Sequence, residues 1–347
     1  MHSVYPIEPP ISPMLARAAA AIPHGAGWLY EPKWDGFRAI VFRDGDRVHI
    51  GSRNQLALER YFPELIDPLR EALPPRCVAD GEIVLPGEKG LDWDALSQRI
   101  HPAASRVAML AAKTPAWFVA FDLLAEGDDD LRPRPTAERR TALEHALSAH
   151  PQVALTPQTS DPVEADRWFS RFEGAGLDGV VAKRAEQVYV PGERVMVKVK
   201  HVRTADCVVG GFRLASDGGG IGSLLLGLYD DDGVLHHVGH TSSFDAAERR
   251  MLRERLRPLE GGSSFGTGRT PGGPSRWARD RDTSWVALEP SLVCEVSFDQ
   301  LQGSRFRHAS RLLRWRPDRS PRDCTYAQLE PPHPFALADI VELGRRR

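Results

Sequence analysis

The chain has 347 residues, enough for about two domains that each bury a core of their own. Its composition, 41% hydrophobic and 27% charged residues, is that of an ordinary globular protein and excludes disordered and membrane proteins. No apolar run approaches the roughly 20 residues that cross a bilayer, and the first residues lack a secretory signal pattern, so we expect a cytoplasmic protein without a membrane anchor.

The four cysteines and the preference for arginine over lysine further limit the class of protein that the sequence can encode. The cysteines are far apart and form no CxxC pair, which excludes a zinc ribbon and predicts reduced thiols. The formal net charge of -2 does not by itself predict a nucleic-acid partner, but the net charge of a whole chain can hide a basic face. Only six of the 45 basic residues are lysine, so a cluster of lysines marks places where an ammonium group is needed. These lysines are Lys33, Lys89, Lys113, Lys183, Lys198 and Lys200.

Strands and two helices are expected along the first two hundred residues. A ribbon over 30–54 turns at Asp44 and Gly45. One helix begins at Thr136 as N-cap and reaches His150; the next has Asp161 as N-cap, Pro162 in the first turn, Glu164 as a capping-box carboxylate and Gly174 at its end. Further strands are expected over 77–86, 117–124, 178–184 and 195–200. The pattern predicts a mixed α+β domain with a mostly antiparallel sheet.

After about His201 the pattern becomes that of a β-barrel. Strands are expected over 206–214 and 222–240, with a hairpin at Asp231 to Gly233, then a helix from Asp245 to Arg257, a Gly, Pro and Ser-rich loop over 261–275 and a strand over 291–300. This order matches the five-stranded Greek-key barrel of oligonucleotide-binding (OB) domains. We therefore expect two domains, 1–202 and 203–347.

The C-terminal tail from Leu301 is basic. It has ten arginines against five acidic residues, a local charge of about +5, which suits a phosphate-facing surface, although a merely solvated tail is the alternative. The arginines are Arg305, Arg307, Arg311, Arg314, Arg316, Arg319, Arg322, Arg345, Arg346 and Arg347.

Lys33 stands in the segment KWDGFR, where Gly36 permits a turn that brings Lys33, Asp35 and Arg38 around one point. Taken alone, this segment is better explained by an ordinary turn with surface charges, but three further segments remove that preference. Lys198 and Lys200 lie two residues apart on an expected strand, so both ammonium groups project from one face. Two such charges repel unless an anion lies between them, and a polyphosphate would fill that place.

Two further segments add carboxylates to this candidate site. Glu82 follows an expected turn at Asp80 and Gly81, and Asp178 opens the strand that carries Lys183. On strands, both carboxylates can face a cleft, where they would bind Mg²⁺ or accept a ribose hydroxyl. The segment WFVAFDLL adds Phe121, either as a core residue or as a ring that stacks on a purine.

These segments together resemble a known superfamily. KWDGFR, SRN (52–54), DGEIV, FDLL, DGVVAK and KVK, in this order, look like motifs I, Ia, III, IIIa, IV and V of the covalent nucleotidyltransferases, and RWRPDR (314–319) resembles motif VI. Stretches outside the motifs, such as SQRIHPAASR and RTADCVVGGFR, resemble the bacterial ligase C branch of ATP-dependent DNA ligases, from about Pro9 to Leu329. The resemblance implies an antiparallel-sheet, ATP-grasp-like adenylation domain followed by an OB-fold barrel.

The resemblance also implies a role for each matched residue. Lys33 would attack the α-phosphorus of ATP and carry AMP through a phosphoramidate bond, with Asp35 and Arg38 beside it in the catalytic motif. Glu82 and Asp178 would bind Mg²⁺ or Mn²⁺, although Asp178 stands where the superfamily usually has the longer glutamate, which leaves direct metal contact in doubt. The remaining nucleotide contacts would come from Glu31, Arg53, Glu82, Phe121, Lys183, Lys198, Lys200, Arg316 and Asp318, the last two when the barrel closes.

The physical chemistry of lysine agrees with this role. A lysine nucleophile must lose a proton near neutral pH, and neighbouring cations lower the pKa of a lysine and then neutralise the departing pyrophosphate. The AMP would pass to a 5′-phosphate in nicked double-stranded DNA, and the 3′-hydroxyl would displace it. The 347 residues hold neither a nicotinamide-binding domain nor a four-cysteine zinc module, which favours ATP over NAD.

Two other functions remain open at this point. One is an RNA ligase or a capping-type nucleotidyltransferase of the same superfamily. The other is a non-catalytic nucleic-acid-binding protein whose barrel does the work, although a lysine retained at position 33 in an arginine-rich chain speaks against it. The resemblance further implies a monomer acting in DNA repair, recombination or replication, with a primase-polymerase as a possible repair partner.

Overall fold

The computed structural model describes residues 5–88, 90–216, 218, 220–266, 269–271, 284–329 and 337–345. The chain forms two compact units: 1–201 together with 331–347, and 202–330.

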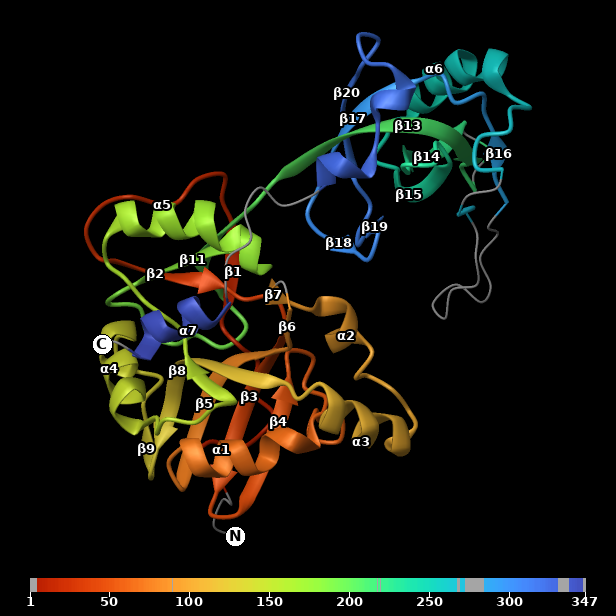
Figure 1. Cartoon of the computed structure of the whole chain (residues 1–347). Helices are drawn as coiled ribbons and strands as arrows, with labels where there is room; N and C mark the ends of the chain where they lie inside the picture. Colours follow the sequence, from red (N-terminus) through yellow and green to blue (C-terminus); the bar gives the residue numbers. More distant parts are fainter. Residues whose placement is uncertain are drawn as a thin grey trace. The chain divides into compact units, whose positions relative to one another are not determined.

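The first unit contains two sheets (Figure 1). The smaller sheet has the order β1-β12-β11-β2, formed by Leu15–Ala18, Arg194–Lys200, Gly179–Arg184 and Trp28–Lys33. The larger sheet has the order β10-β8-β5-β3-β4, formed by Val153–Leu155, Trp117–Glu126, Arg76–Val84, Phe37–Asp44 and Arg47–Ser52, with β9 (Asp129–Asp130) beside β8. Pairing within these sheets is antiparallel except for β1 with β12 and β10 with β8, which confirms the expected α+β class.

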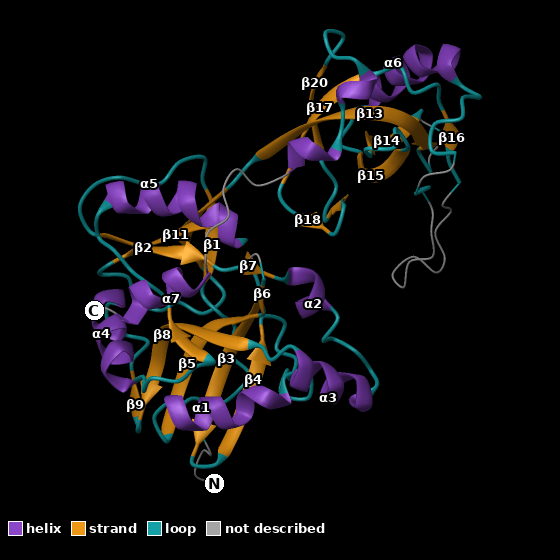
Figure 2. Ribbon diagram, viewed as in Figure 1, coloured by secondary structure: helices purple, strands orange, loops and turns teal. Residues whose placement is uncertain are grey.

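Helices lie against the two sheets of this unit (Figure 2). The alternation of side chains along each strand decides which residues face a helix and which face the other sheet. Along β3, Ala39 and Val41 pack under α1 (Ile66–Ala72) and α4 (Thr136–Ala146), whereas Ile40 and Phe42 face the smaller sheet, because side chains alternate along a strand. The other face of the smaller sheet is covered by α5 (Pro162–Arg171). The two sheets therefore face each other.

The remaining elements of the first unit are short or peripheral. They are η1 (Pro63–Leu65), β6 (Pro86–Gly87), β7 (Gly90–Leu91), α2 (Trp93–Ser97), α3 (Ala104–Lys113), η2 (Phe172–Ala175) and α7 (Leu337–Arg345). No helix in the described part of the chain is both long and apolar enough to span a membrane.

The second unit is a curled antiparallel sheet with the order β15-β14-β13-β17-β20. An isolated bridge between Thr241 and Ser310 joins its outer strands, as closure of a barrel requires. The strands are β13 (Arg203–Leu214), β14 (Ile221–Tyr229), β15 (Leu235–Thr241), β16 (Val286–Ala287), β17 (Val293–Phe298), β18 (Leu301–Gln302), β19 (Arg305–Phe306) and β20 (Arg311–Trp315), and the helices are α6 (Ala246–Leu256), η3 (Arg257–Leu259), η4 (Pro321–Asp323) and η5 (Tyr326–Leu329). The hairpin at Asp231–Gly233 is confirmed, and the helix expected from Asp245 to Arg257 is α6, with Asp245 as its N-cap.

Several expected boundaries are wrong. Asp80 and Gly81 lie inside β5 and form no turn, because the carboxylate of Asp80 is satisfied by side chains of the core. Pro135, not Thr136, is the N-cap of α4, since the hydroxyl of Thr136 donates to the carbonyl oxygen of Gln187 at 2.8 Å. The same helix ends at Ala146, short of His150.

At the start of α5, the expected N-cap is present and the expected capping box is not. Asp161 accepts a hydrogen bond from the backbone N–H of Val163, as predicted. Glu164 makes no capping box, because it accepts a hydrogen bond from the indole of Trp168 at 2.7 Å. The chain leaves the helix at Gly176, whose φ of 80° suits glycine, and not at Gly174.

The C-terminal residues do not stay with the barrel as expected. Residues 331–347 belong to the first unit, since α7 buries Leu337, Ile340 and Val341 in an apolar cluster there. The expected loop over 261–275 falls partly outside the described residues, at 267, 268 and 272–275, as do Arg346 and Arg347 of the tail.

Candidate active site

The site is a cavity of about 190 Å³ between the two sheets of the first unit. Eight of the residues selected from the sequence line it: Glu31, Lys33, Arg38, Arg53, Glu82, Phe121, Lys183 and Lys198. Residues that the sequence did not indicate complete the wall: Met14, Leu15, Ala16, Pro32, Trp34, Val181, Arg194 and Met196. Trp34 directly follows Lys33, which is the one signal that would have found it.

Strand register brings Lys33, Asp178 and Lys200 together at one end of the smaller sheet. Gly179, at the start of β11, is opposite both Lys33 of β2 and Lys200 of β12. One carboxylate oxygen of Asp178 lies 2.7 Å from the Lys33 ammonium and 2.8 Å from that of Lys200. A side chain at Gly179, which has a φ of 140°, would lie 2.0 Å from the carbonyl oxygen of Val199. Only glycine permits this close approach of strands.

The charges around Asp178 set its protonation state. Burial by itself would raise the pKa of the Asp178 carboxyl, but the ammonium groups of Lys33 and Lys200 hold it below its ordinary value. The anion was expected between Lys198 and Lys200, whereas the structure places a carboxylate of the protein itself between Lys33 and Lys200. It neutralises part of a charge cluster that would otherwise be unstable.

Lys198 lines the cavity, as do Arg53 and Arg194. It lies on the same side of β12 as Lys200 and has no ion-pair partner among the residues that the structure describes. Burial, together with the charges of Lys33 and Lys200, lowers the pKa of Lys198. An ammonium in this setting is ready to meet an anionic ligand.

A second ion pair, between Lys183 and Glu31, forms another part of the cavity wall. The Lys183 ammonium lies 2.8 Å from a carboxylate oxygen of Glu31, and Gln158 donates to the other oxygen at 2.8 Å. Lys183 also donates to the carbonyl oxygen of Phe121 at 3.2 Å. Both ions are nearly fully buried, so Glu31 and Lys183 form a fixed polar wall in which Lys183 is already paired with a carboxylate.

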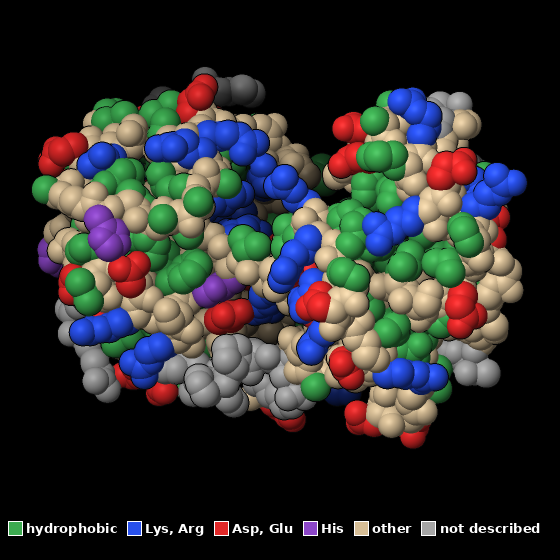
Figure 3. Space-filling model, turned by 90° about the horizontal axis from the view of Figure 1, so that it is seen from above, with side chains coloured by type: hydrophobic (Ala, Val, Ile, Leu, Met, Phe, Trp, Pro, Cys, Tyr) green, Lys and Arg blue, Asp and Glu red, His purple; other side chains and the backbone are tan. Residues whose placement is uncertain are grey.

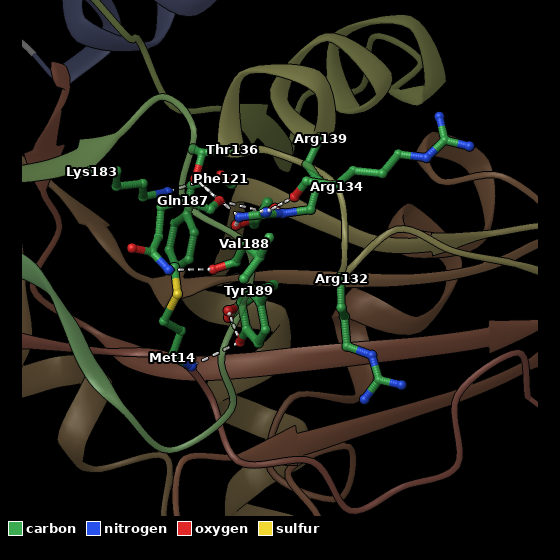
Figure 4. A network of polar contacts seen from close by, with 12 residues as sticks. Met14, Phe121, Arg132, Arg134, Thr136, Arg139, Lys183, Gln187, Val188 and Tyr189 are labelled. Carbon is green, nitrogen blue, oxygen red and sulfur yellow. Dashed lines mark hydrogen bonds and ion pairs between the residues drawn. The ribbon is translucent and has the colours of Figure 1, made fainter. Parts of the chain in front are cut away.

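Arg38 is held by residues that the sequence did not reveal. Its guanidinium donates twice to Asp80, at 2.6 and 2.7 Å, and lies 4.3 Å from the centre of the Phe121 ring. Tyr189 donates to Asp80 at 2.7 Å and accepts from the backbone N–H of Met14 at 2.9 Å (Figure 4). Burial would lower the pKa of Arg38, but Asp80 raises it above its ordinary value, so this cation is permanent.

Glu82 lies opposite Arg38 in the pairing of β5 with β3. Burial raises the pKa of the Glu82 carboxyl to about 7, despite the nearby charges of Arg38 and Lys33. Gly36 lies close to the backbone beside Glu82. A side chain at Gly36 would lie 2.1 Å from the carbonyl oxygen of Ile83, the residue that follows Glu82. Gly36 thus permits a close backbone approach, and Asp35 does not line the cavity as the expected turn would have required.

Two of the predicted residues belong to the other unit. Arg316 pairs with Asp318 at 2.8 Å and with Asp206 at 3.0 Å, and these groups do not line the cavity. Other tail arginines are also neutralised, because Arg314 pairs with Glu295 and Arg319 with Asp206. The tail is therefore less of a free basic surface than its sequence suggests.

The cavity can hold a small anion-bearing ligand and gives it a nucleophile. Lys33 and Lys198 line the cavity and supply amines and positive charge, Phe121 supplies an aromatic ring, and Lys200 and Asp178 lie outside the lining but are joined to Lys33 by ion pairs. Among the described residues, no group of three or more His, Cys, Asp or Glu side chains could hold a metal ion by itself. A metal here would share its ligands with a phosphorylated substrate.

Comparison with known proteins agrees with this chemistry. A family model described as "ATP dependent DNA ligase domain" matches residues 13–200, and one described as "ATP dependent DNA ligase C terminal region" matches residues 217–319. The chain is 53% identical to DNA ligase C of Mycobacterium tuberculosis, over 97% of this chain and 98% of that protein. It is 54% identical to DNA ligase C2 of Mycolicibacterium smegmatis, over 94% of this chain and 97% of that protein.

A solved structure supports the fold. A structure from a study of Lig E DNA ligases matches with a TM-score of 0.53 and 19% identity, over 88% of this chain and 100% of that chain. The two domain matches, the high identity over nearly the full length and the lysine-rich cavity lead to one conclusion. The chain belongs to the ATP-dependent DNA ligases of the bacterial ligase C type.

Proposed function

We propose that the chain seals nicks in double-stranded DNA through a covalent AMP on Lys33. The Lys33 amine, after losing its proton, forms a bond to the α-phosphorus of ATP as the bond to pyrophosphate breaks. The AMP then moves to the 5′-phosphate of a nick, and the 3′-hydroxyl attacks that phosphate, forms the phosphodiester and releases AMP. The observation that supports this most directly is that Lys33, held in the Lys33–Asp178–Lys200 cluster, lines a cavity that the Phe121 ring also lines.

The cavity residues divide into those that orient the nucleoside and those that meet its phosphates. The Phe121 ring, backed on one side by Arg38, would stack on the adenine, and Glu31 would accept a hydrogen bond from the base. Glu82 and Arg53 would contact the ribose and the phosphate next to it. Lys198 and Lys200 would meet the charge that develops on the phosphates, where positioned cations contribute most to the rate.

A divalent cation, Mg²⁺ or Mn²⁺, fits the site only together with ATP. Asp178 and Glu82 each offer one carboxylate, and Mg²⁺ is commonly held by one or two carboxylates plus substrate phosphates. Bound in this way, the cation would neutralise charge on the phosphates. Asp178, which now pairs with Lys33, would then be shared with the cation, so its ion pair with the lysine would be weaker.

The wider role is part of the same proposal. Arg316 and Asp318 of motif VI would assist the reaction with ATP when the barrel domain closes, which requires Arg316 to exchange its present carboxylate partners for phosphates. The proposal includes a monomer that acts in the cytoplasm in short-gap repair, with a primase-polymerase as a possible partner, as the resemblance to the ligase C branch implies.

Mass spectrometry of the full-length protein tests the proposal. Incubation with ATP and Mg²⁺ should add the mass of one AMP, incubation with GTP should add none, and Lys33→Ala should stay unmodified. Lys113→Ala, which removes an exposed lysine of α3, is the matched control and should be adenylated normally. The proposal fails if Lys33→Ala is adenylated like the wild type or if the adenylated protein does not seal a nicked duplex.

A further inference from the structure

The last described helix, α7, packs against the domain that holds the cavity. Its apolar face contributes Leu337, Ile340 and Val341, and Ile340 is fully buried. The same cluster contains Trp34, the residue that follows Lys33, and Ala154 of β10. The helix therefore completes a core that reaches the wall of the candidate active site.

The backbone of α7 also lies directly on β10. A side chain at Gly344 would place its first carbon 2.1 Å from the carbonyl oxygen of Leu155. A contact that short is possible only for glycine, so the position of Gly344 fixes the distance between the helix and the strand. The end of β10 has no freedom to move toward α7.

The residues that follow β10 hold the strand of Lys33 at three points. Trp34 donates from its indole to the hydroxyl of Thr156 at 2.8 Å, and Gln158 donates to Glu31 at 2.8 Å. Thr159 exchanges two backbone hydrogen bonds with Tyr30, at 2.8 and 3.0 Å. These contacts lie on both sides of Lys33 in the sequence, so a shift of 156–159 would move the lysine and the Glu31 wall together.

We propose that α7 positions the nucleotide pocket, acting through Leu155, Thr156 and Trp34 on the placement of Lys33. This inference rests on the proposed adenylation of Lys33. Its physical basis is that a displacement of about 1 Å in a reacting group can cost about a hundredfold in rate. α7 touches no nucleotide and is a positioning element, so its loss affects the step in which Lys33 is the nucleophile more than the step in which it is not.

The test compares these two steps in full-length variants. Gly344→Leu forces α7 away from Leu155 and should slow self-adenylation by ATP at least about tenfold. Sealing of a nicked duplex that already carries AMP on its 5′-phosphate, without ATP, should change less than about threefold, because the lysine is not a reactant there. Asp339→Asn, an exposed position of the same helix, is the matched control and should leave both rates within about twofold of the wild type.

A second variant covers the case in which Gly344→Leu fails to fold. Thr156→Val keeps the shape of the side chain but removes the acceptor of the Trp34 indole, and it should show the same preference for the adenylation step, together with a raised KM for ATP. Equal losses in both steps, or wild-type adenylation by a folded Gly344→Leu, would overturn the positioning role. A wild-type protein that gains no AMP on Lys33 would instead refute the proposed function.

Discussion

Glu82 and Asp178 belong to the same site, yet the pKa values of their carboxyl groups move in opposite directions. Burial raises the pKa of Glu82 to about 7. Burial would raise that of Asp178 as well, but two ammonium groups within 2.8 Å reverse the effect. The environment therefore gives one carboxyl a proton near neutral pH and keeps the other ionised, so Asp178 is ready to meet cations, whereas Glu82 must lose its proton before it can bind one.

The raised pKa of Glu82 predicts a pH dependence of stability. Between the unfolded pKa of 4.5 and the folded value of about 7, the folded protein binds the extra proton, so its stability falls as the pH rises through this range. Between pH 5 and 8, the wild type should lose on the order of 1–3 kcal/mol more than Glu82→Gln. Urea unfolding at the two pH values measures this, and equal losses in both proteins would contradict it.

The effect of substituting Asp178 on the adenylation rate should depend on the charge of the new side chain and not on its volume. Asp178→Asn keeps the size of the side chain but leaves Lys33 and Lys200 without their carboxylate, and adenylation should slow about a hundredfold. Asp178→Glu keeps the charge and should stay within about tenfold of the wild type. Single-turnover transfer of AMP from ATP is the measurement, and an asparagine variant as fast as the glutamate variant would refute the role.

The reacting lysines were predictable from the sequence, and the residues that hold their surroundings were not. Lysine in an arginine-rich chain is a local signal that needs no partner. Asp80 and Tyr189 gave no such signal, because they meet 109 residues apart in the sequence. Buried networks of this kind depend on tertiary contacts between segments whose own patterns look ordinary.

At the scale of elements, Gly81 in β5 serves close packing and not a turn. The pair Asp80–Gly81 looks like a turn in the sequence, but the structure continues the strand through it. A side chain at Gly81 would lie 2.3 Å from the ring of Phe118, on the neighbouring strand. The glycine is needed for close packing under an aromatic ring.

This packing predicts unequal costs for two strand glycines. Gly81→Ala should lower the free energy of unfolding by about 3 kcal/mol, because neither the Phe118 ring nor the backbone beside it can move freely. Gly51→Ala in β4 meets only ordinary contacts of 3.7 Å or more and should cost less than about 1 kcal/mol. Chemical denaturation of both variants decides this, and similar costs would show that the core adapts.

At the scale of the whole molecule, basic side chains on the surface offer contacts to the phosphates of DNA. Figure 3 shows a row of Lys and Arg side chains across the surface of the first unit. Contacts between such cations and DNA phosphates release counterions, so nick sealing should fall at least about tenfold between roughly 50 and 200 mM salt. Self-adenylation needs no DNA and should change much less over the same range. A flat salt response of sealing would argue against phosphate contacts of this kind.

The sequence by itself determined the longer strands and the helices α4 and α5 of the antiparallel first domain, the barrel and the lysines of the site, whereas it gave no sign of α1, α2 and α3. The features that it determined follow from local periodicity, turn residues and the unusual choice of lysine over arginine, which a chain carries in short segments. Only the tertiary structure decided that α7 returns to the first domain, that Arg316 is paired with Asp206, and that Asp178 separates Lys33 from Lys200. The reason is physical: burial and charge pairing arise between segments distant in the chain, and they exist only once the sheets have met.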